Sequence, residues 1–361
     1  MKAAVCYEFG KPLVIEELAI RPPEEEEVKV RVAATAICHS DIHGIKGDFG
    51  GGLPFVPGHE TAGHVEEVGA DVTSVGPGDA VIVSLLEPCG KCHFCITGLP
   101  HLCKMKLTYD FEGVLKNQKG EGVFQNARVG GFAEYVVVHE SQLVKIADDF
   151  PLDLASLLAC GVTTGFGAVV NRAQVRPLSS VVVIGTGGVG LNAVQGAVTC
   201  GADPIIAVDI LDSKLMRARE FGATRTVNAD ETDPVQAVLE LTGGKGADYV
   251  FVTVGSSAAV QQGFSMLDKR GTEVIVGIPP SSENMLSLPA GEFAMTEKTL
   301  TGGYMGSIRL SVDIPRLVSL YHAGRLKLDE LITGRYPLDR INEAIESSAK
   351  GEALRNVILF E

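Results

Sequence analysis

The segment Gly185–Gly190 places the strongest single constraint on the fold. Its sequence, GTGGVG, fits the pattern G-x-G-x-x-G, follows the β-branched run Val181–Ile184 and leads into the amphipathic stretch Leu191–Cys200. Glycines between a strand and a helix let the backbone turn tightly and approach a pyrophosphate, whose charge the helix N-terminus receives. The pattern alone is weak evidence. In this context it predicts a dinucleotide site built on Gly185, Gly187, Gly188, Val189 and Gly190.

Strands alternate with helical stretches along the region that follows. Further β-rich runs are Ile205–Val208, Val250–Val254 and Glu273–Val276, and helical stretches are Ser213–Phe221 and Ala258–Leu267. Such alternation indicates βαβ units and a parallel sheet that is buried on both faces. Right-handed crossovers then predict a doubly wound α/β fold.

Asp209 ends the second of these strands, 24 residues after Gly185. A carboxylate there can hydrogen-bond the ribose 2′- and 3′-hydroxyls of adenosine and repels a 2′-phosphate, so we expect a preference for NAD over NADP. The alternative is that Asp209 caps the helix ahead of Ser213, although Asp212 is better placed to cap it.

The first 160 residues have a different pattern. Short β-rich runs are separated by turn signals such as Pro57-Gly58, and we find no regular alternation with helices. These runs include Ala3–Tyr7, Val28–Ala33, Ala80–Ser84 and Ala133–Val138. A mostly β, barrel-like domain is therefore expected. The tail from about residue 305 holds a predicted helix, Ile314–Ala323, and a predicted strand, Asn356–Phe360.

Composition excludes several classes of function. The net charge of −14 argues against a nucleic-acid partner, because binding to a phosphate backbone needs a basic face. The sequence has no run of about 18 apolar residues, which is the length needed to span a membrane. Met1–Lys11 also lacks the pattern of a secretory signal. We therefore expect a cytoplasmic protein whose eight cysteines serve metal binding more than disulfides.

Four of the eight cysteines form a cluster with the spacing Cys89-x2-Cys92-x2-Cys95-x7-Cys103. Four thiolates close a tetrahedral shell around zinc, which is typical of a structural site with no open position. An iron–sulfur cluster is the alternative. However, the bacterial ferredoxin spacing ends in a gap of three and a proline, whereas here the last gap is seven and Lys104 follows.

The stretch Gly58-His59-Glu60-x2-Gly63-x5-Gly69-x2-Val72 resembles the zinc signature of the medium-chain alcohol dehydrogenases. Matching segments run from Val28 to the last predicted strand, and the cysteine spacing is similar to the structural-zinc lobe of that family. The resemblance implies that Cys38, His59 and Cys160 bind a catalytic zinc. It also implies that Glu60 approaches the metal and that Asp41 orients the histidine ligand. Taken singly and without the resemblance, His59 and Cys160 are better explained as buried core residues.

The same resemblance assigns roles around a bound NAD. It implies that Ser40 takes the alcohol proton and that His43 passes it outward. A hydroxyl is both donor and acceptor, and a histidine titrates near neutral pH. The implied cofactor contacts are His39, Thr164, Lys214, Val254, Ile278 and Arg355. The alternatives are that His43 is an exposed loop residue and that Lys214 lies on a solvated helix face.

The predicted architecture is a GroES-like β-barrel catalytic domain, residues 1–161, completed by residues 305–361, with a Rossmann cofactor domain at 162–304 between them. The predicted enzyme holds two zinc ions, one catalytic and one structural. It exchanges hydride between NAD and a small alcohol, aldehyde or ketone in a cleft between the domains. The expected apolar substrate wall is Phe55, Leu85, Leu86, Ile278 and Tyr304. We expect a homodimer or homotetramer, joined through sheet edges at Leu286–Leu288 and Thr299–Gly303.

Two alternative functions remain open from the sequence. A thiol-adduct formaldehyde dehydrogenase is suggested by lysines after the metal lobe: Lys104, Lys106, Lys116 and Lys119. Phe49, which stands where the glutathione-dependent branch would have an acid, argues against it. The other alternative is a non-catalytic regulatory protein that binds zinc or a dinucleotide.

Overall fold

The computed structural model describes residues 1–104, 113–283 and 285–360, and these form two compact units. The first unit consists of residues 1–160, 309–323 and 328–361, and the second of residues 161–308 and 324–327. The chain therefore enters the second unit after Cys160. The C-terminal region belongs to the first unit, except for the short segment 324–327.

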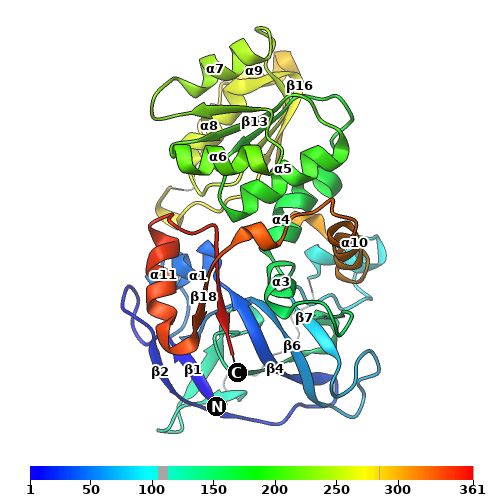
Figure 1. Ribbon diagram of the computed structural model, residues 1–361, viewed down its shortest axis with the longest axis vertical. Coiled ribbons are helices and arrows are strands. Elements are labelled where there is room, and N and C mark those ends of the chain that lie inside the picture. Colours follow the sequence, from blue (N-terminus) through cyan, green and yellow to red (C-terminus); the bar gives the residue numbers. More distant parts are fainter. Residues whose placement is uncertain (105–112, 284, 361) are drawn as a thin grey trace. The chain divides into compact units, whose positions relative to one another are not determined.

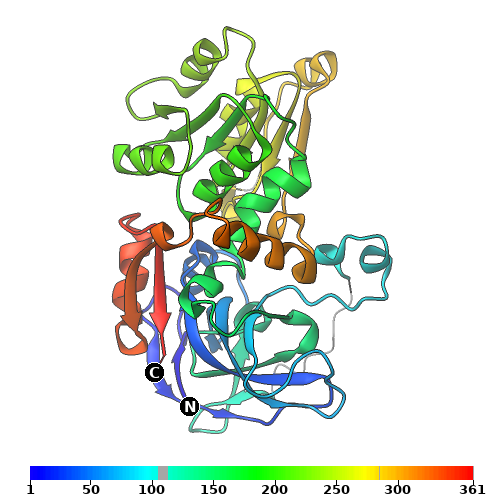
Figure 2. The same cartoon turned by 45° about the vertical axis from the view of Figure 1, so that its right-hand side comes forward.

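The main sheet of the first unit has seven strands among the described residues, in the order β11-β7-β6-β4-β19-β18, with β10 also paired to β4. The strands are β4 (Glu27–Ala36), β6 (Glu60–Val68), β7 (Ala80–Val83), β10 (Tyr135–His139), β11 (Leu143–Lys145), β18 (Ile332–Pro337) and β19 (Arg355–Leu359). Figure 2 shows the C-terminal strands returning beside the N-terminal part of the unit, where β19 pairs antiparallel with β4.

Two smaller sheets and five α-helices complete the first unit in its described part. The strands are β1 (Lys2–Val5), β2 (Val14–Glu17), β3 (Ala19–Ile20), β5 (Phe55–Val56), β8 (Leu115–Lys116) and β9 (Gly122–Gln125). The helices are α1 (His39–Lys46), α2 (His93–Ile96), α3 (Leu152–Leu157), α10 (Leu310–His322) and α11 (Ile341–Ala349). Helix α11 packs against β18 and β19, and α1 lies next to α11 (Figure 1).

The second unit contains a parallel sheet of six strands among the described residues, in the order β14-β13-β12-β15-β16-β17. The strands are β12 (Val181–Ile184), β13 (Ile205–Asp209), β14 (Arg225–Asn228), β15 (Ala247–Val252), β16 (Leu267–Ile275) and β17 (Thr299–Gly302). Numbered within the unit, this order is 3-2-1-4-5-6, the doubly wound order of dinucleotide-binding sheets. The predicted doubly wound fold is confirmed.

The helices of this unit are α4 (Gly161–Gly167), α5 (Gly188–Cys200), α6 (Asp212–Glu220), α7 (Pro234–Leu241), α8 (Ser257–Met266) and α9 (Ala290–Thr296). In the single chain Leu286–Leu288 forms no strand, and Leu288 packs against the core of the unit; its pairing with a second copy stays a prediction. Of the two predicted segments, Thr299–Gly303 contains the edge strand β17, so assembly through that edge stays a prediction. None of the described helices is both long and apolar enough to cross a bilayer.

Candidate functional site

Cys38, His59, Glu60 and Cys160 come together in the first unit although they are distant in sequence. Each offers a ligand atom, and these atoms all lie within 4.8 Å of one another; all four residues are buried. Cys38 directly precedes α1, His59 and Glu60 stand at the start of β6, and Cys160 follows α3. The dispersed residues that the sequence singled out therefore form one cluster.

Asp41, in the first turn of α1, connects the segments that carry Cys38 and His59 through hydrogen bonds. Its carboxylate accepts hydrogen bonds from the backbone N–H groups of Cys38 and Gly58, both at 3.1 Å, and lies 2.8 Å from Nδ1 of His59. The carboxylate is 1% exposed. Because Nδ1 of His59 faces this acceptor, Nε2 is left free to bind a metal, as in carboxylate–histidine–metal arrangements.

Ser40 lies on the side of the cluster where Nε2 is directed. Its hydroxyl donates to Sγ of Cys38 at 3.1 Å and lies 3.4 Å from Nε2 of His59. A hydroxyl that can both donate and accept a hydrogen bond therefore stands next to two candidate ligands. His43 follows three residues later on the same helix and is about one-third exposed.

The ionisation of the two thiols is linked. The Cys38 thiolate accepts a hydrogen bond from Cys160, which holds the pKa of Cys38 well below its usual value. The same bond, together with burial, raises the pKa of Cys160 well above its usual value. Burial lowers the pKa of His59, but the charge and hydrogen bond of Asp41 outweigh it and raise this pKa overall. Such a site favours a bound cation, whose charge lets both thiols ionise.

Glu60 and Arg355 form a buried ion pair beside the cluster, with Nη2 of Arg355 3.2 Å from Oε1 of Glu60. The pair lacks hydrogen-bond geometry, and neither carboxylate oxygen has a hydrogen-bond partner among the residues that the structure describes. Burial raises the pKa of Glu60 to about 8, although the charge of Arg355 opposes this rise. Nη1 of Arg355 donates to the carbonyl of Ile37 at 3.2 Å. The carboxylate of Glu60 can therefore offer an oxygen atom to a metal bound at the cluster.

The four clustered cysteines form a second group of ligand atoms within 4.8 Å of one another, and all four are free thiols. Sγ of Cys89 lies 4.0 Å from Sγ of Cys95, and Sγ of Cys92 lies 3.8 Å from Sγ of Cys103. A tetrahedron with Zn–S bonds of about 2.3 Å has edges of about 3.8 Å, so the separations fit a zinc tetrahedron. Backbone hydrogen bonds, first from Cys95 and then from Lys104, lower the pKa of Cys92 to about 6.

In the second unit the Gly-rich turn has the geometry of a phosphate-binding turn. Gly185 has φ +87°, and a Cβ on Gly190 would lie 1.8 Å from the carbonyl oxygen of Gly185, so neither position tolerates a side chain. Gly187 precedes α5 and has open space around its Cα, which leaves room for a ligand. The turn therefore presents the α5 N-terminus to an anion.

Asp209 faces this turn. Its Oδ2 accepts hydrogen bonds from the backbone and hydroxyl of Thr186 at 2.7 and 3.0 Å, and Oδ1 accepts from the backbone of Ile210 and Leu211. The sequence did not single out Thr186. The expected capping role of Asp212 is wrong, because Asp212 is the first residue of α6 and accepts a hydrogen bond from Asn228 instead.

The remaining predicted cofactor and substrate residues differ widely in exposure. Thr164 is buried against Met305, Lys214 is partly buried, and His39, Val254 and Ile278 are exposed. Of the expected wall, Phe55 and Leu86 are buried, Leu85 is partly buried, and Tyr304 is about half exposed. Lys106 lies outside the described residues.

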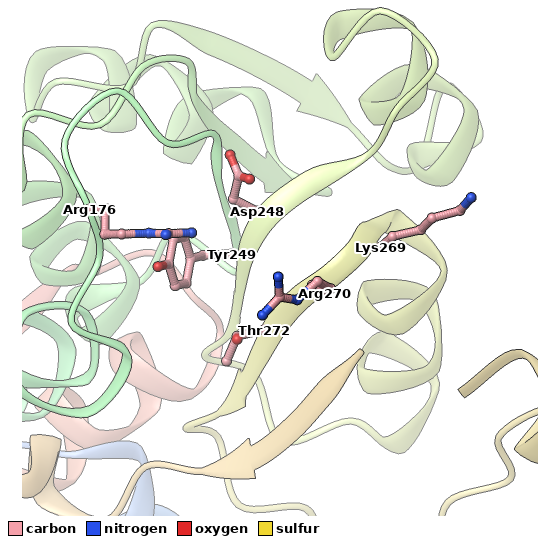
Figure 3. Close-up of a pocket in the computed structure, with 6 residues that line it drawn as sticks. All are labelled: Arg176, Asp248, Tyr249, Lys269, Arg270 and Thr272. Carbon is pink, nitrogen blue, oxygen red and sulfur yellow. The ribbon is translucent and has the colours of Figure 1, made fainter. Parts of the chain in front are cut away.

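A cavity of about 340 Å³ in the second unit is lined by Arg176, Asp248, Tyr249, Lys269, Arg270 and Thr272. These residues stand at or before the amino-terminal ends of β12, β15 and β16, whereas the Gly-rich turn follows the carboxyl end of β12. Figure 3 shows Lys269 extending away from Tyr249. The cavity thus lies at the amino-terminal ends of the strands, opposite the carboxyl ends where the Gly-rich turn lies. It is not the predicted dinucleotide site.

Comparison with known proteins decides the family. A sequence model described as alcohol dehydrogenase GroES-like domain matches residues 24–148, and one described as zinc-binding dehydrogenase matches residues 188–323. The NDMA-dependent alcohol dehydrogenase of Amycolatopsis methanolica is 40% identical over 99% of this chain and 98% of its own length. The chain belongs to the zinc-containing medium-chain alcohol dehydrogenase family.

Solved structures agree with this membership. An alcohol dehydrogenase zinc-binding domain protein from Burkholderia ambifaria has a TM-score of 0.94 and 36% identity, over 100% of this chain and 98% of that one. Benzyl alcohol dehydrogenase from Acinetobacter calcoaceticus has a TM-score of 0.92 and 35% identity, over 100% and 99%. The predicted family and the predicted combination of a GroES-like and a Rossmann fold are confirmed, and the chain is an alcohol oxidoreductase of this family.

Proposed function

We propose that this member of the alcohol dehydrogenase family uses zinc to transfer hydride between a primary or secondary alcohol and NAD⁺, giving an aldehyde or ketone and NADH. The observation that carries the proposal is the buried cluster of Cys38, His59 and Cys160, with Asp41 behind the histidine and Ser40 beside a thiol. A regulatory protein would not need a proton-transfer hydroxyl at such a cluster.

Cys38, His59 and Cys160 would hold the catalytic Zn²⁺, and Glu60, whose carboxylate is paired with Arg355 but accepts no hydrogen bond from the described residues, is a further donor within reach. When bound there, Zn²⁺ supplies Lewis-acid chemistry that makes the hydroxyl of an alcohol more acidic. Cys89, Cys92, Cys95 and Cys103 would hold the structural Zn²⁺, since their sulfur separations fit a closed tetrahedron.

The residues of α1 then have separate tasks. Asp41 holds the imidazole of His59 in one orientation through Nδ1. Ser40 receives the alcohol proton at its hydroxyl, and His43 releases that proton to solvent. Residues three apart on a helix lie on the same face, which supports passage of the proton from Ser40 toward His43.

The cofactor part of the proposal rests on the second unit. The Gly-rich turn and the α5 N-terminus would bind the pyrophosphate of NAD, and Asp209 would bind the adenosine ribose. His39, Thr164, Lys214, Val254, Ile278 and Arg355 are proposed as further contacts. A second candidate is dependence on NDMA, for which the name of the Amycolatopsis relative is the supporting observation.

The test is a substrate and acceptor panel with the purified chain. Benzyl alcohol is the first substrate to try, because a similar solved structure is named benzyl alcohol dehydrogenase. We expect the absorbance of the reduced cofactor to rise strongly with NAD⁺, which gives NADH, and only weakly with NADP⁺, which gives NADPH. Turnover that requires NDMA would favour the second candidate, and activity only with formaldehyde plus glutathione would favour a thiol-adduct dehydrogenase.

Ser40→Ala tests the chemistry within the cluster. It should lower the rate of alcohol oxidation by about 10²–10⁴-fold, the usual contribution of a positioned proton-transfer group. Ser265→Ala is the matched control, because the Ser265 hydroxyl is exposed and donates to the carbonyl of Gln261 within its own helix. Zinc content should be unchanged in both variants. A Ser40→Ala enzyme with full activity would refute the proposed proton path.

A further inference from the structure

Two separate hydrogen bonds join Asp48 to His43. The Asp48 carboxylate lies 2.6 Å from Nδ1 of the His43 ring, and the Asp48 backbone N–H donates to the His43 carbonyl at 3.0 Å. Both side chains are about one-third exposed. The sequence pattern gave no sign of this pair, because four residues and the end of a helix separate its members.

The end of α1 fixes the position of Asp48. Gly47 stops the helix in the left-handed conformation, with φ +85°, and its N–H donates to the carbonyl of Gly44. The next N–H, that of Asp48, then returns to the carbonyl of His43, which completes a Schellman-type cap. A side chain on Gly47 would be strained by its φ and would meet the Phe9 ring at 2.9 Å. The carboxylate is therefore held over the last turn of α1, where His43 stands.

The contact determines which ring nitrogen of His43 can accept a proton. A carboxylate accepts but does not donate, so Nδ1 must carry the hydrogen of this bond. In the neutral ring, Nε2 then keeps its lone pair and is the atom that can receive a proton. When it does so, the imidazolium is stabilised by the negative charge 2.6 Å from Nδ1. The Phe49 ring, next to Asp48 in the sequence, also packs near the imidazole, with the two ring centroids 5.5 Å apart.

We propose that Asp48 is the positioning residue of the proton path: it holds His43 in the tautomer that accepts at Nε2 and stabilises the ring while it carries the proton. This inference rests on the proposed role of His43 in alcohol oxidation. The proton arriving from Ser40 binds Nε2 of His43 and leaves from the same nitrogen to water, so Asp48 itself neither gains nor loses a proton.

The main test compares Asp48→Asn with wild type in the zinc-loaded enzyme. An asparagine can donate to Nδ1 and so stabilise the wrong tautomer, and it removes the charge that favours the imidazolium. The plateau of the rate of alcohol oxidation should fall by about 10–100-fold. KM for the alcohol should change little, because Asp48 does not contact the substrate site. Asp48→Glu should restore part of the rate, and Asp71→Asn, at an exposed carboxylate, should leave it unchanged.

A double variant separates this inference from the proposed function. If Asp48 acts through His43, then Asp48→Asn combined with His43→Gln should be no slower than His43→Gln alone. Unchanged kinetics in His43→Gln would refute the proton path itself. A slow His43→Gln with a normal Asp48→Asn, or effects that multiply in the double variant, would refute only the role of Asp48.

A second readout needs no turnover. In protein labelled with ¹⁵N-histidine, the His43 ring signal is assigned by its loss in His43→Gln. At a pH where the ring is neutral, wild type should show a protonated Nδ1, and Asp48→Asn should show the proton moved to Nε2. A wild-type ring protonated on Nε2, or one that Asp48→Asn leaves unaltered, would overturn the proposal.

Discussion

At the scale of single residues, Asp209 has more partners than the sequence suggested. A carboxylate has about four lone-pair positions, and the hydrogen bonds from Thr186, Ile210 and Leu211 already use four. A ribose hydroxyl must therefore share or displace one of them. We expect a ribose hydroxyl to replace a hydrogen bond from Thr186, because Thr186 belongs to the Gly-rich turn that the cofactor would contact.

Asp209→Gly should move the preference between NAD and NADP toward NADP by about 1–3 kcal/mol, the scale of losing a buried hydrogen-bonded charge. The ratio of kcat/KM for the two cofactors measures this shift. Thr186→Val is the matched control, since it removes one hydrogen bond to Asp209 but keeps the carboxylate, and it should still prefer NAD. A wild-type enzyme that uses both cofactors equally would show that Asp209 does not select the ribose.

Single residues also show where sequence reasoning stops. Gly185 and Gly190 could be predicted, because a fixed spacing follows from the turn they form. Cys38, His59 and Cys160 have no such spacing, and only family resemblance linked them. Asp48 was missed entirely, because its contact depends on the left-handed end of α1 at Gly47, which no side-chain pattern marks.

At the scale of elements, β16 carries an unusual buried acid. Glu273 is fully buried, neither of its carboxylate oxygens has a hydrogen-bond partner in the described part of the chain, and α8 packs against it at Gly263. Burial raises the pKa of Glu273 to about 8, although the charge of Lys298 opposes this rise. The folded chain therefore holds a proton here that the unfolded chain releases at a much lower pH.

The consequence is a loss of stability with rising pH. Since the pKa is about 4.5 in the unfolded chain and about 8 in the folded one, the free energy of unfolding should fall between these values and then level off. Glu273→Gln, which cannot ionise, should lose about 4 kcal/mol less of its free energy of unfolding than wild type between pH 5 and pH 9. The free energy of unfolding can be measured by urea titration at each pH. Circular dichroism is the suitable signal, because the chain has no tryptophan whose fluorescence could report unfolding. Equal pH slopes in wild type and Glu273→Gln would contradict this, and Glu231→Gln is an exposed control.

Elements were predicted best where their period was clear. The runs that became β12, β13 and α5 were placed within a few residues, because buried strands and an amphipathic helix leave strong patterns. The strand β14, with its polar sequence Arg225–Asn228, and the helix α7 were not identified. The β14 strand lies at the edge of its sheet and gains its structure from pairing with β13, a partner that a local pattern does not show.

At the scale of the whole molecule, two groups of candidate ligands differ in a way that chemistry can separate. The cluster at Cys38 offers two thiols and one imidazole, with Glu60 nearby, and all of these are buried. The lobe of Cys89, Cys92, Cys95 and Cys103 offers four thiols, each partly exposed. Three protein ligands leave a position for substrate, whereas four thiolates close the shell.

The purified chain should therefore contain close to two zinc ions. A chelator can enter the open coordination position but must displace a thiolate from the closed shell, so activity should be lost before the lobe loses its metal. Elemental analysis at successive times, alongside activity and circular dichroism, follows the two losses separately. Cys103→Ser should lower zinc content to about one per chain and cost stability, whereas Cys160→Ser should abolish activity with the fold retained. Iron in the purified chain, or full activity with a single zinc, would show that the two clusters do not divide the catalytic and structural tasks in this way.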